Sequence, residues 1–123
     1  DLLQFPDIWA LGYFKWELEF LATLGFGLDL EKCAVTGSTA DLKFISPKSG
    51  RAVSQAGAGE WSSKLLPFPI VASGQGNSLE DILDGLKVSQ FFLERKVLVA
   101  FGMEHLPAAR LRFMSSLEKK IRN

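Results

Sequence analysis

The stretch DIWALGYFKWELEFLATL, residues 7–24, carries apolar side chains at the spacing of one long α-helix. Asp7 is suited to cap its N-terminus, and Gly25 and Gly27 are suited to end it. At about 100° per residue the apolar side chains form two nearly opposite stripes. The helix is therefore either the centre of its domain or shared between its own core and a second body. The stripes contain Trp9, Tyr13, Trp16, Phe20 and Leu24 on one side, and Leu11, Phe14, Leu18 and Leu21 on the other.

A short β-hairpin is predicted over residues 40–54. Residues 40–46 alternate between apolar and polar side chains, Pro47 and Gly50 favour a tight turn, and residues 51–54 return as a second strand. The segment 55–77 is rich in glycine and proline, which predicts a loop. We expect the rest of the protein to cover this loop, because it carries Trp61, Leu65, Leu66, Phe68 and Ile70.

Two further helices are predicted after this loop. Ser78 is suited to cap a helix that runs to about residue 100, and Pro107 is suited to open a last helix. The fold class is therefore mainly α: a single small domain over residues 1–123, with about three main helices and one short β-hairpin. The predicted inner faces contain Leu79, Leu83, Leu86, Gln90, Leu93 and Val97, and then Leu111, Met114, Leu117 and Ile121.

Composition favours one folded domain. The chain has 123 residues, 14 basic and 14 acidic side chains and 47% hydrophobic residues, which excludes disordered and collagen-like proteins. A pI near 6.8 does not favour nucleic-acid binding by bulk charge, although basic residues gather from Arg95 onward. The chain has no apolar run of bilayer length, no secretory signal and a single cysteine, so we expect a cytoplasmic location. It opens without an initiator methionine, so we expect it to be part of a longer protein.

No catalytic or metal chemistry is predicted. A structural zinc needs about four nitrogen or sulfur ligands, whereas the chain has one cysteine and one histidine. His105 has no candidate nucleophile near it in sequence, and Cys33 is followed by small residues typical of a buried position. The Gly74 and Gly76 pair resembles the start of a dinucleotide site, but Leu79 occupies the position of the third glycine. We therefore predict no enzyme activity and no cofactor.

Several stretches, taken in their order along the chain, are similar to one known family. They are FKWELEFLATLGFGLDL (14–30), CAVTG (33–37), FISPKSGRAV (44–53), FFLER (91–95) and LPAAR (106–110). Together they resemble the bacterial RecO recombination-mediator family over nearly the whole chain. The resemblance implies the helical carboxy-terminal region of RecO, which follows an amino-terminal DNA-binding OB-fold that this chain does not contain. Many members hold zinc near the hairpin through Cys-x-x-Cys pairs, whereas here Thr36 stands at the second position after Cys33, which implies a zinc-free version.

The resemblance also implies a function in recombinational DNA repair. Members displace the single-stranded-DNA-binding protein SSB from DNA, anneal single strands and, together with RecR, help to load RecA. The acidic, phenylalanine-ended tail of SSB recruits RecO by docking on the helical region. The implied partners are therefore the SSB tail, RecR and single-stranded DNA, the last mainly through the missing OB-fold, with no membrane and no small-molecule substrate.

A dock for such a tail needs an apolar hole for the terminal phenylalanine and cations for the neighbouring carboxylates. Lys15 lies between the two stripes of the first helix and matches a basic position that the family uses for tail contact. Arg110 matches a recurrent arginine of the family, either as a tail contact or as an ion-pair partner in helix packing. The predicted tail-binding residues are Lys15, Leu11, Trp16, Leu18 and Arg110.

Two other functions remain open at this point. In the first, the domain is a structural scaffold that packs on and stabilises the OB-fold through its outer aromatic stripe. In the second, the cationic end of the chain contacts DNA directly. The residues that would make this contact are Arg95, Lys96, Arg112 and Lys119, together with Arg110, which also has a predicted role in tail binding or helix packing.

Overall fold

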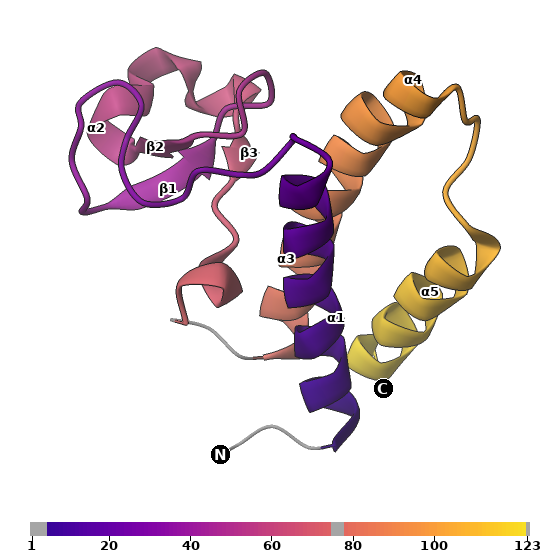
Figure 1. Ribbon diagram of the computed structural model, residues 1–123. Coiled ribbons are helices and arrows are strands. Elements are labelled where there is room, and N and C mark those ends of the chain that lie inside the picture. Colours follow the sequence, from indigo (N-terminus) through magenta and orange to yellow (C-terminus); the bar gives the residue numbers. More distant parts are fainter. Residues whose placement is uncertain (1–4, 75–77, 123) are drawn as a thin grey trace.

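The computed structural model describes residues 5–74 and 78–122. The fold is mainly helical with a small antiparallel sheet, as predicted. Figure 1 shows two lobes: a helical lobe that contains α1, α3, α4 and α5, and a small lobe that contains the three strands and α2. The elements in chain order are α1 (Phe5–Thr23), β1 (Leu42–Ile45), β2 (Ala52–Ser54), α2 (Gln55–Ala58), the 3-10 helix η1 (Gly59–Lys64), β3 (Leu66–Pro67), the 3-10 helix η2 (Ile70–Ser73), α3 (Leu79–Phe92), the π-helical turn η3 (Leu93–Val97), α4 (Leu98–Phe101) and α5 (Ala108–Arg122).

Helix α1 begins at Phe5, two residues before the predicted cap, so Asp7 lies inside the helix. Its predicted two-faced character is confirmed in outline, but the buried face differs in detail. The fully buried residues follow the spacing 4, 3, 4, which is the period of one helix face. Leu11 and Leu18 flank this face and are half-buried. The buried face consists of Ala10, Phe14, Glu17 and Leu21.

The neighbouring side of α1, which carries the predicted aromatic stripe, is partly open. Trp9 is 66% exposed and Trp16 is 54% exposed, whereas Tyr13 between them is half-buried. The aromatic stripe of α1 is therefore only partly covered within this chain.

Helices α3 and α4 form one continuous helix through η3, close to the predicted range. Ser78 and Asp81 form a reciprocal capping box at the start, and Gly102 ends the helix with φ 66°. A side chain at Gly85 would meet the Phe14 ring at 3.0 Å. The missing side chain therefore allows α1 and α3 to approach closely in the centre of the helical lobe.

The inner face of α5 agrees with the prediction at Met114 and Leu117 but differs at its start. Leu111, predicted to be buried, is 50% exposed, and Arg110 is buried in its place. Arg110 shares a face with Met114 and Leu117 at the spacing 4, 3, so the helix period itself places it inward. The buried carboxylate of Glu17 on α1 receives it.

The small lobe contains a three-stranded sheet with the order β2-β1-β3. Strand β1 pairs with β2 in the predicted hairpin, and β3, which comes from the predicted loop 55–77, adds to its other edge. Most of this loop forms short helical turns, and its last residues, 75–77, lie outside the described residues. Trp61 is 58% exposed and Ile70 is 38% exposed, so the expectation that the large apolar side chains of this loop are covered is wrong at these two positions.

One hydrophobic cluster joins the two lobes. Leu21 of α1, Ile45 of β1 and Phe92 of α3 are all buried in it. A second cluster lies between α1, α3 and α5, and a third lies inside the small lobe around Cys33. The lobes are therefore packed on one another through apolar side chains.

Candidate functional site

An apolar cavity lies where α1, the η3–α4 segment and α5 meet. Its volume is about 380 Å³. An apolar cavity of about 150 Å³ is known to accept benzene, so this cavity has room for a phenyl ring and its neighbouring atoms. Its lining residues are Tyr13, Trp16, Glu17, Phe20, Leu93, Val97, Leu98, Met103, Leu106, Pro107, Ala109, Arg110 and Phe113.

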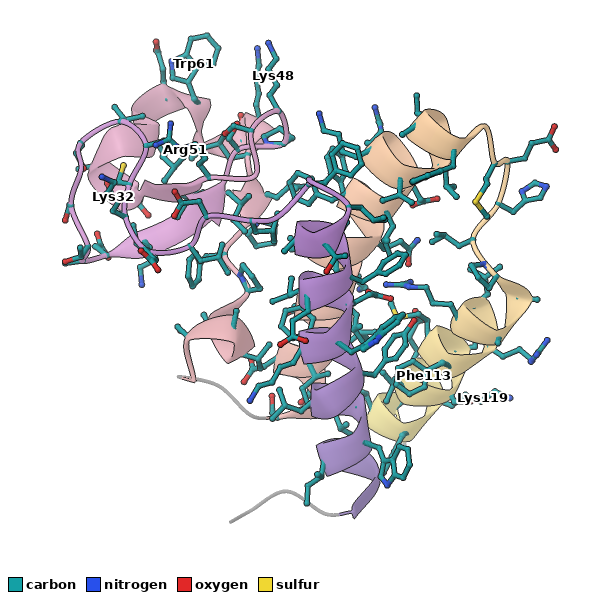
Figure 2. The ribbon with its side chains drawn as sticks, in the orientation of Figure 1. Lys32, Lys48, Arg51, Trp61, Phe113 and Lys119 are labelled. Carbon is teal, nitrogen blue, oxygen red and sulfur yellow. The ribbon has the colours of Figure 1, made fainter. Side chains whose placement is uncertain are left out.

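Aromatic rings border this cavity on two sides. Tyr13 of α1 meets Phe113 of α5 edge to face, with 5.0 Å between ring centroids. Figure 2 shows Phe113 in the space between α5 and α1. On α1, Trp16 stacks between Tyr13 at 5.9 Å and Phe20 at 5.3 Å. The cavity can therefore offer both ring edges and ring faces to an aromatic ligand.

A buried ion pair forms the polar part of the cavity wall. The Nε and Nη2 atoms of Arg110 donate to the two carboxylate oxygens of Glu17 at 2.7 and 2.8 Å. Nη1 donates to the side-chain oxygen of Gln90 at 2.7 Å, and Nη2 also donates to the Leu86 carbonyl at 3.0 Å. Ser89 donates its hydroxyl to Glu17. The network leaves no buried side-chain polar atom unpaired among the described residues.

This network also shifts the pKa values of its neighbours. Burial alone would lower the pKa of Arg110, but the hydrogen bonds and negative charge of Glu17 outweigh it and raise that pKa. Burial and, next, the Glu17 carboxylate raise the pKa of Tyr13 to about 12. At neutral pH the cavity wall therefore contains a charged arginine and a neutral tyrosine.

The structure brings together only some of the predicted tail-binding residues. Trp16 and Arg110 both line the cavity. Leu11 and Leu18 instead pack against the cluster between α1, α3 and α5. Lys15 is exposed and does not line the cavity, although it directly precedes Trp16.

Arg110 occupies the ion-pair role that was one of its two predicted roles. Four of its five N–H groups donate to Glu17, Gln90 and Leu86. Its charge is balanced by Glu17, so Arg110 contributes little net positive charge to the cavity. An attraction for carboxylates must come mainly from cations outside this pair.

Sequence reasoning missed Glu17 as a site residue. The signal was present, because Glu17 is in phase with Phe14 and Leu21 on the buried face of α1. An acidic residue in phase with one buried face and a basic residue in phase with another predict a buried pair, since isolated buried charges are strongly disfavoured. Tyr13 and Phe113 were not recognisable in this role, because their contact depends on the approach of α1 and α5.

The predicted DNA-contact residues form no single patch. Arg95 lies over the Phe91 ring at 5.2 Å, and Lys96 lines a second, smaller cleft. Arg112 and Lys119 line a shallow groove on α5, and Figure 2 shows Lys119 on the outer side of that helix. The four side chains thus belong to two separate surfaces.

Cys33 is the polar centre of the small lobe. Its buried sulfur accepts hydrogen bonds from the backbone N–H groups of Val35, Thr36 and Ser54 at 3.4, 3.3 and 3.2 Å. It also accepts the Ser54 hydroxyl at 3.4 Å. Burial alone would raise the pKa of the Cys33 thiol, but these hydrogen bonds outweigh it and lower that pKa to about 6. The sulfur therefore connects the loop of residues 33–37 to the end of β2.

Other candidate chemistry is sparse. Within residues 5–74 and 78–122, no group of three or more His, Cys, Asp and Glu side chains could hold a metal ion. His105 is exposed and lies 3.7 Å from Glu104 on the loop before α5. In the same part of the chain, no helix combines the length and the apolar character needed to cross a bilayer.

Comparisons with known proteins agree with the resemblance in the sequence. The family model described as "Recombination protein O C terminal" matches residues 1–103. Three curated relatives named "DNA repair protein RecO" come from Ruegeria sp., Jannaschia sp. and Cereibacter sphaeroides. They are 49%, 49% and 46% identical over 98%, 92% and 97% of this chain. The chain spans 51%, 46% and 50% of their lengths, which is about half.

These matches define a class of DNA recombination and repair proteins. Within that class, the chain belongs to the RecO family. No solved structure matches the chain.

Proposed function

We propose that this chain is the non-catalytic, partner-binding region of a cytoplasmic recombination mediator. In this proposal the acidic, phenylalanine-ended tail of SSB recruits it to single-stranded DNA. The mediator then helps RecR to load RecA and anneals single strands, with most DNA contacts made by an OB-fold outside this chain. The observation that carries the proposal is the aromatic-bordered cavity between α1, η3–α4 and α5.

The cavity meets the first requirement of such a tail. It is lined almost entirely by apolar side chains, and its volume of about 380 Å³ accommodates a benzyl side chain. The ring faces of Trp16 and Phe20 and the ring edges of Tyr13 and Phe113 can pack against that side chain. The terminal phenylalanine of the tail therefore occupies the cavity in this proposal.

The second requirement is positive charge for the acidic residues of the tail. Arg110 lines the cavity but is balanced by Glu17. Lys15 is exposed, and no hydrogen bond or ion pair engages its ammonium group among the described residues. We therefore assign Lys15 as the cation that contacts the acidic residues of the tail, which extend from the cavity past Trp16.

A cavity-filling substitution tests the apolar half of this site. Ala109 lines the cavity and is itself exposed, so Ala109→Phe fills the cavity without removing core atoms. We expect an acidic peptide ending in phenylalanine to bind this variant about tenfold or more weakly, a loss of about 1.4 kcal/mol, in isothermal titration. Ala108→Phe is the matched control, because Ala108 is also exposed but does not line the cavity. Equal peptide affinity for the two variants would remove the cavity from the proposal.

Charge reversal tests the other half. Lys15→Glu should weaken binding of the same peptide several-fold. The difference in affinity between this variant and the unmodified protein should shrink as salt is added. Lys87→Glu on α3 is the control, since Lys87 is an exposed helix lysine that does not line the cavity. If Lys15→Glu binds the peptide with unchanged affinity while Ala109→Phe binds it more weakly, the cavity remains part of the proposal, but the contact with the acidic residues must be made by another cation.

A second function is favoured by the open aromatic stripe of α1. Trp9 and Trp16 are both exposed, and together with Ile8, Gly12 and Tyr13 they line a shallow apolar groove. In the scaffold alternative, the amino-terminal OB-fold covers this groove and the region stabilises it. Quenching of tryptophan fluorescence by acrylamide in the full-length protein distinguishes partner docking from the scaffold role. If the groove is free for a partner, the fluorescence that Trp9→Phe removes should be accessible to acrylamide. If the OB-fold covers the groove, the fluorescence that Trp9→Phe removes should be shielded from acrylamide.

A further inference from the structure

A second cleft lies at the junction of the two lobes. Its volume is about 210 Å³, and its lining is more polar than that of the apolar cavity. Three chain segments form it: the loop after α1, the β1–β2 turn and the end of the α3–η3 helix. Its lining residues are Gly25, Phe26, Gly27, Lys48, Ser49, Gly50, Phe92 and Lys96.

The β1–β2 turn holds Lys48 at the edge of this cleft. Gly50 is buried with φ +71°, a backbone conformation that side chains disfavour, and a side chain there would meet Leu28 at 3.0 Å. The turn is therefore seated directly on the loop that follows α1. Figure 2 shows Lys48 at the tip of this turn.

The π-helical turn η3 supplies the second lysine. Lys96 and Phe92, one turn apart, line the junction cleft, whereas Leu93 and Val97 line the apolar cavity. A π turn inserts one residue into a helix and so changes which side chains face each side. Lys96 thus comes from the helical lobe, and Lys48 comes from the small lobe.

The charge around the cleft is positive. Among the residues that the structure describes, no acidic residue lines it. Residues 24–28, 46–51 and 91–97 carry four basic side chains against one acidic side chain, Glu94. Glu94 accepts a hydrogen bond from Gln90, and Arg51 pairs with Asp29 at 4.0 Å. Lys48 and Lys96 have no ion-pair partner among the described residues.

We propose that this junction cleft binds a phosphate group of a single DNA strand, with Lys48 and Lys96 supplying charge from the two lobes. The cleft is smaller and more polar than the apolar cavity, so it does not duplicate that cavity. A phosphodiester needs only a compact cationic site, and a single strand can follow the narrow junction of two lobes. The choice of DNA rests on membership of a DNA-repair family, and the inference does not depend on the tail-binding proposal.

The salt dependence of binding tests this site in the full-length protein. The probe is a fluorescent oligothymidylate, whose affinity is measured by anisotropy at several salt concentrations. The Lys48→Ala/Lys96→Ala variant should bind more weakly, and its slope of log affinity against log salt should be shallower. The expected change is about 0.7 if the two lysines share one phosphate and about 1.4 if each holds its own. The Lys48→Arg/Lys96→Arg variant should retain the original slope, because arginine keeps the charge and binds phosphate well.

Arg112→Ala/Lys119→Ala is the matched control, since it also removes two cations, in this case from the groove on α5. An equal change of slope in this control would mean that only general charge matters, and would overturn the site. A variant of the lysine pair that keeps its DNA slope but loses affinity for the acidic peptide would also overturn it, in favour of a carboxylate site. Loss of peptide binding in Ala109→Phe with an unchanged DNA slope would show that the two sites are separate.

Discussion

The two lobes stabilise their buried polar groups in different ways. In the helical lobe, Glu17 and Arg110 are 93 positions apart in sequence, come from different helices and neutralise one another. In the small lobe, a single sulfur atom of Cys33 accepts four hydrogen bonds, two from its own loop and two from Ser54 at the end of β2. The helical lobe depends on charge pairing at long range, whereas the small lobe depends on one acceptor that organises a short loop. The difference predicts that single substitutions have global effects in the first lobe and local effects in the second.

The largest effect is expected from breaking the ion pair. Glu17→Leu leaves the buried Arg110 guanidinium without its counter-charge, and breaking a buried pair on one side costs about 3–5 kcal/mol. Urea denaturation should show this loss of unfolding free energy. Adding Arg110→Met should restore most of the stability, because an apolar pair of similar volume is often neutral or stabilising. A loss below about 1 kcal/mol for Glu17→Leu would contradict the view that the pair is desolvated.

The pH dependence of the small lobe is expected to be the next largest effect. The folded pKa of Cys33 is about 6, below its ordinary value of 9.0, so the folded lobe binds fewer protons than the unfolded chain between these values. Stability from this group is therefore fully present above pH 9 and is lost as pH falls toward 6, by up to about 1.4 kcal/mol per pH unit. Amide hydrogen exchange of residues 33–57, corrected for its intrinsic rate, measures the change. The same slope in Cys33→Ala would show that another group causes it.

A smaller effect is expected from Cys33→Ala itself at fixed pH. It leaves the N–H groups of Thr36 and Ser54 without their acceptor, at a cost of about 1–3 kcal/mol. Hydrogen exchange should accelerate in the small lobe and change little in α3. Cys33→Ser retains an acceptor and should have a smaller effect. Equal acceleration in both lobes would contradict the local character of this lobe, and would mean that the shared cluster of Leu21, Ile45 and Phe92 transmits the loss.

The hydrophobic period of the chain predicted the main helices well. The range of the long helix from Ser78 was recognisable because its capping residue and its terminal glycine are local signals. The hairpin was recognisable for the same reason, through Pro47 and Gly50. The third strand, β3, was not, because its two residues pair with β1 only after the lobe has folded. Trp61 was misjudged, since composition does not indicate which aromatic residues of an irregular segment face solvent.

The candidate sites were less predictable than the helices. Trp16 and Arg110 were identified, but their position in one cavity depends on how α5 approaches α1. Lys15 could be placed between two stripes of α1, although the cavity lies on the side of Trp16. Lys48 and Lys96 are 48 positions apart and meet at one cleft only because the lobes pack together.

Amino-acid order alone determined the approximate helix ranges, the hairpin and the kinship with RecO, because these depend on periodicity, on turn residues and on short stretches read in order. Tertiary structure alone decided that Glu17 meets Arg110, that Leu111 faces solvent and that an apolar cavity and a cationic cleft lie on either side of η3. The physical reason is that the energies of pairing and cavity formation depend on distances between side chains from separate elements. A linear pattern does not contain those distances.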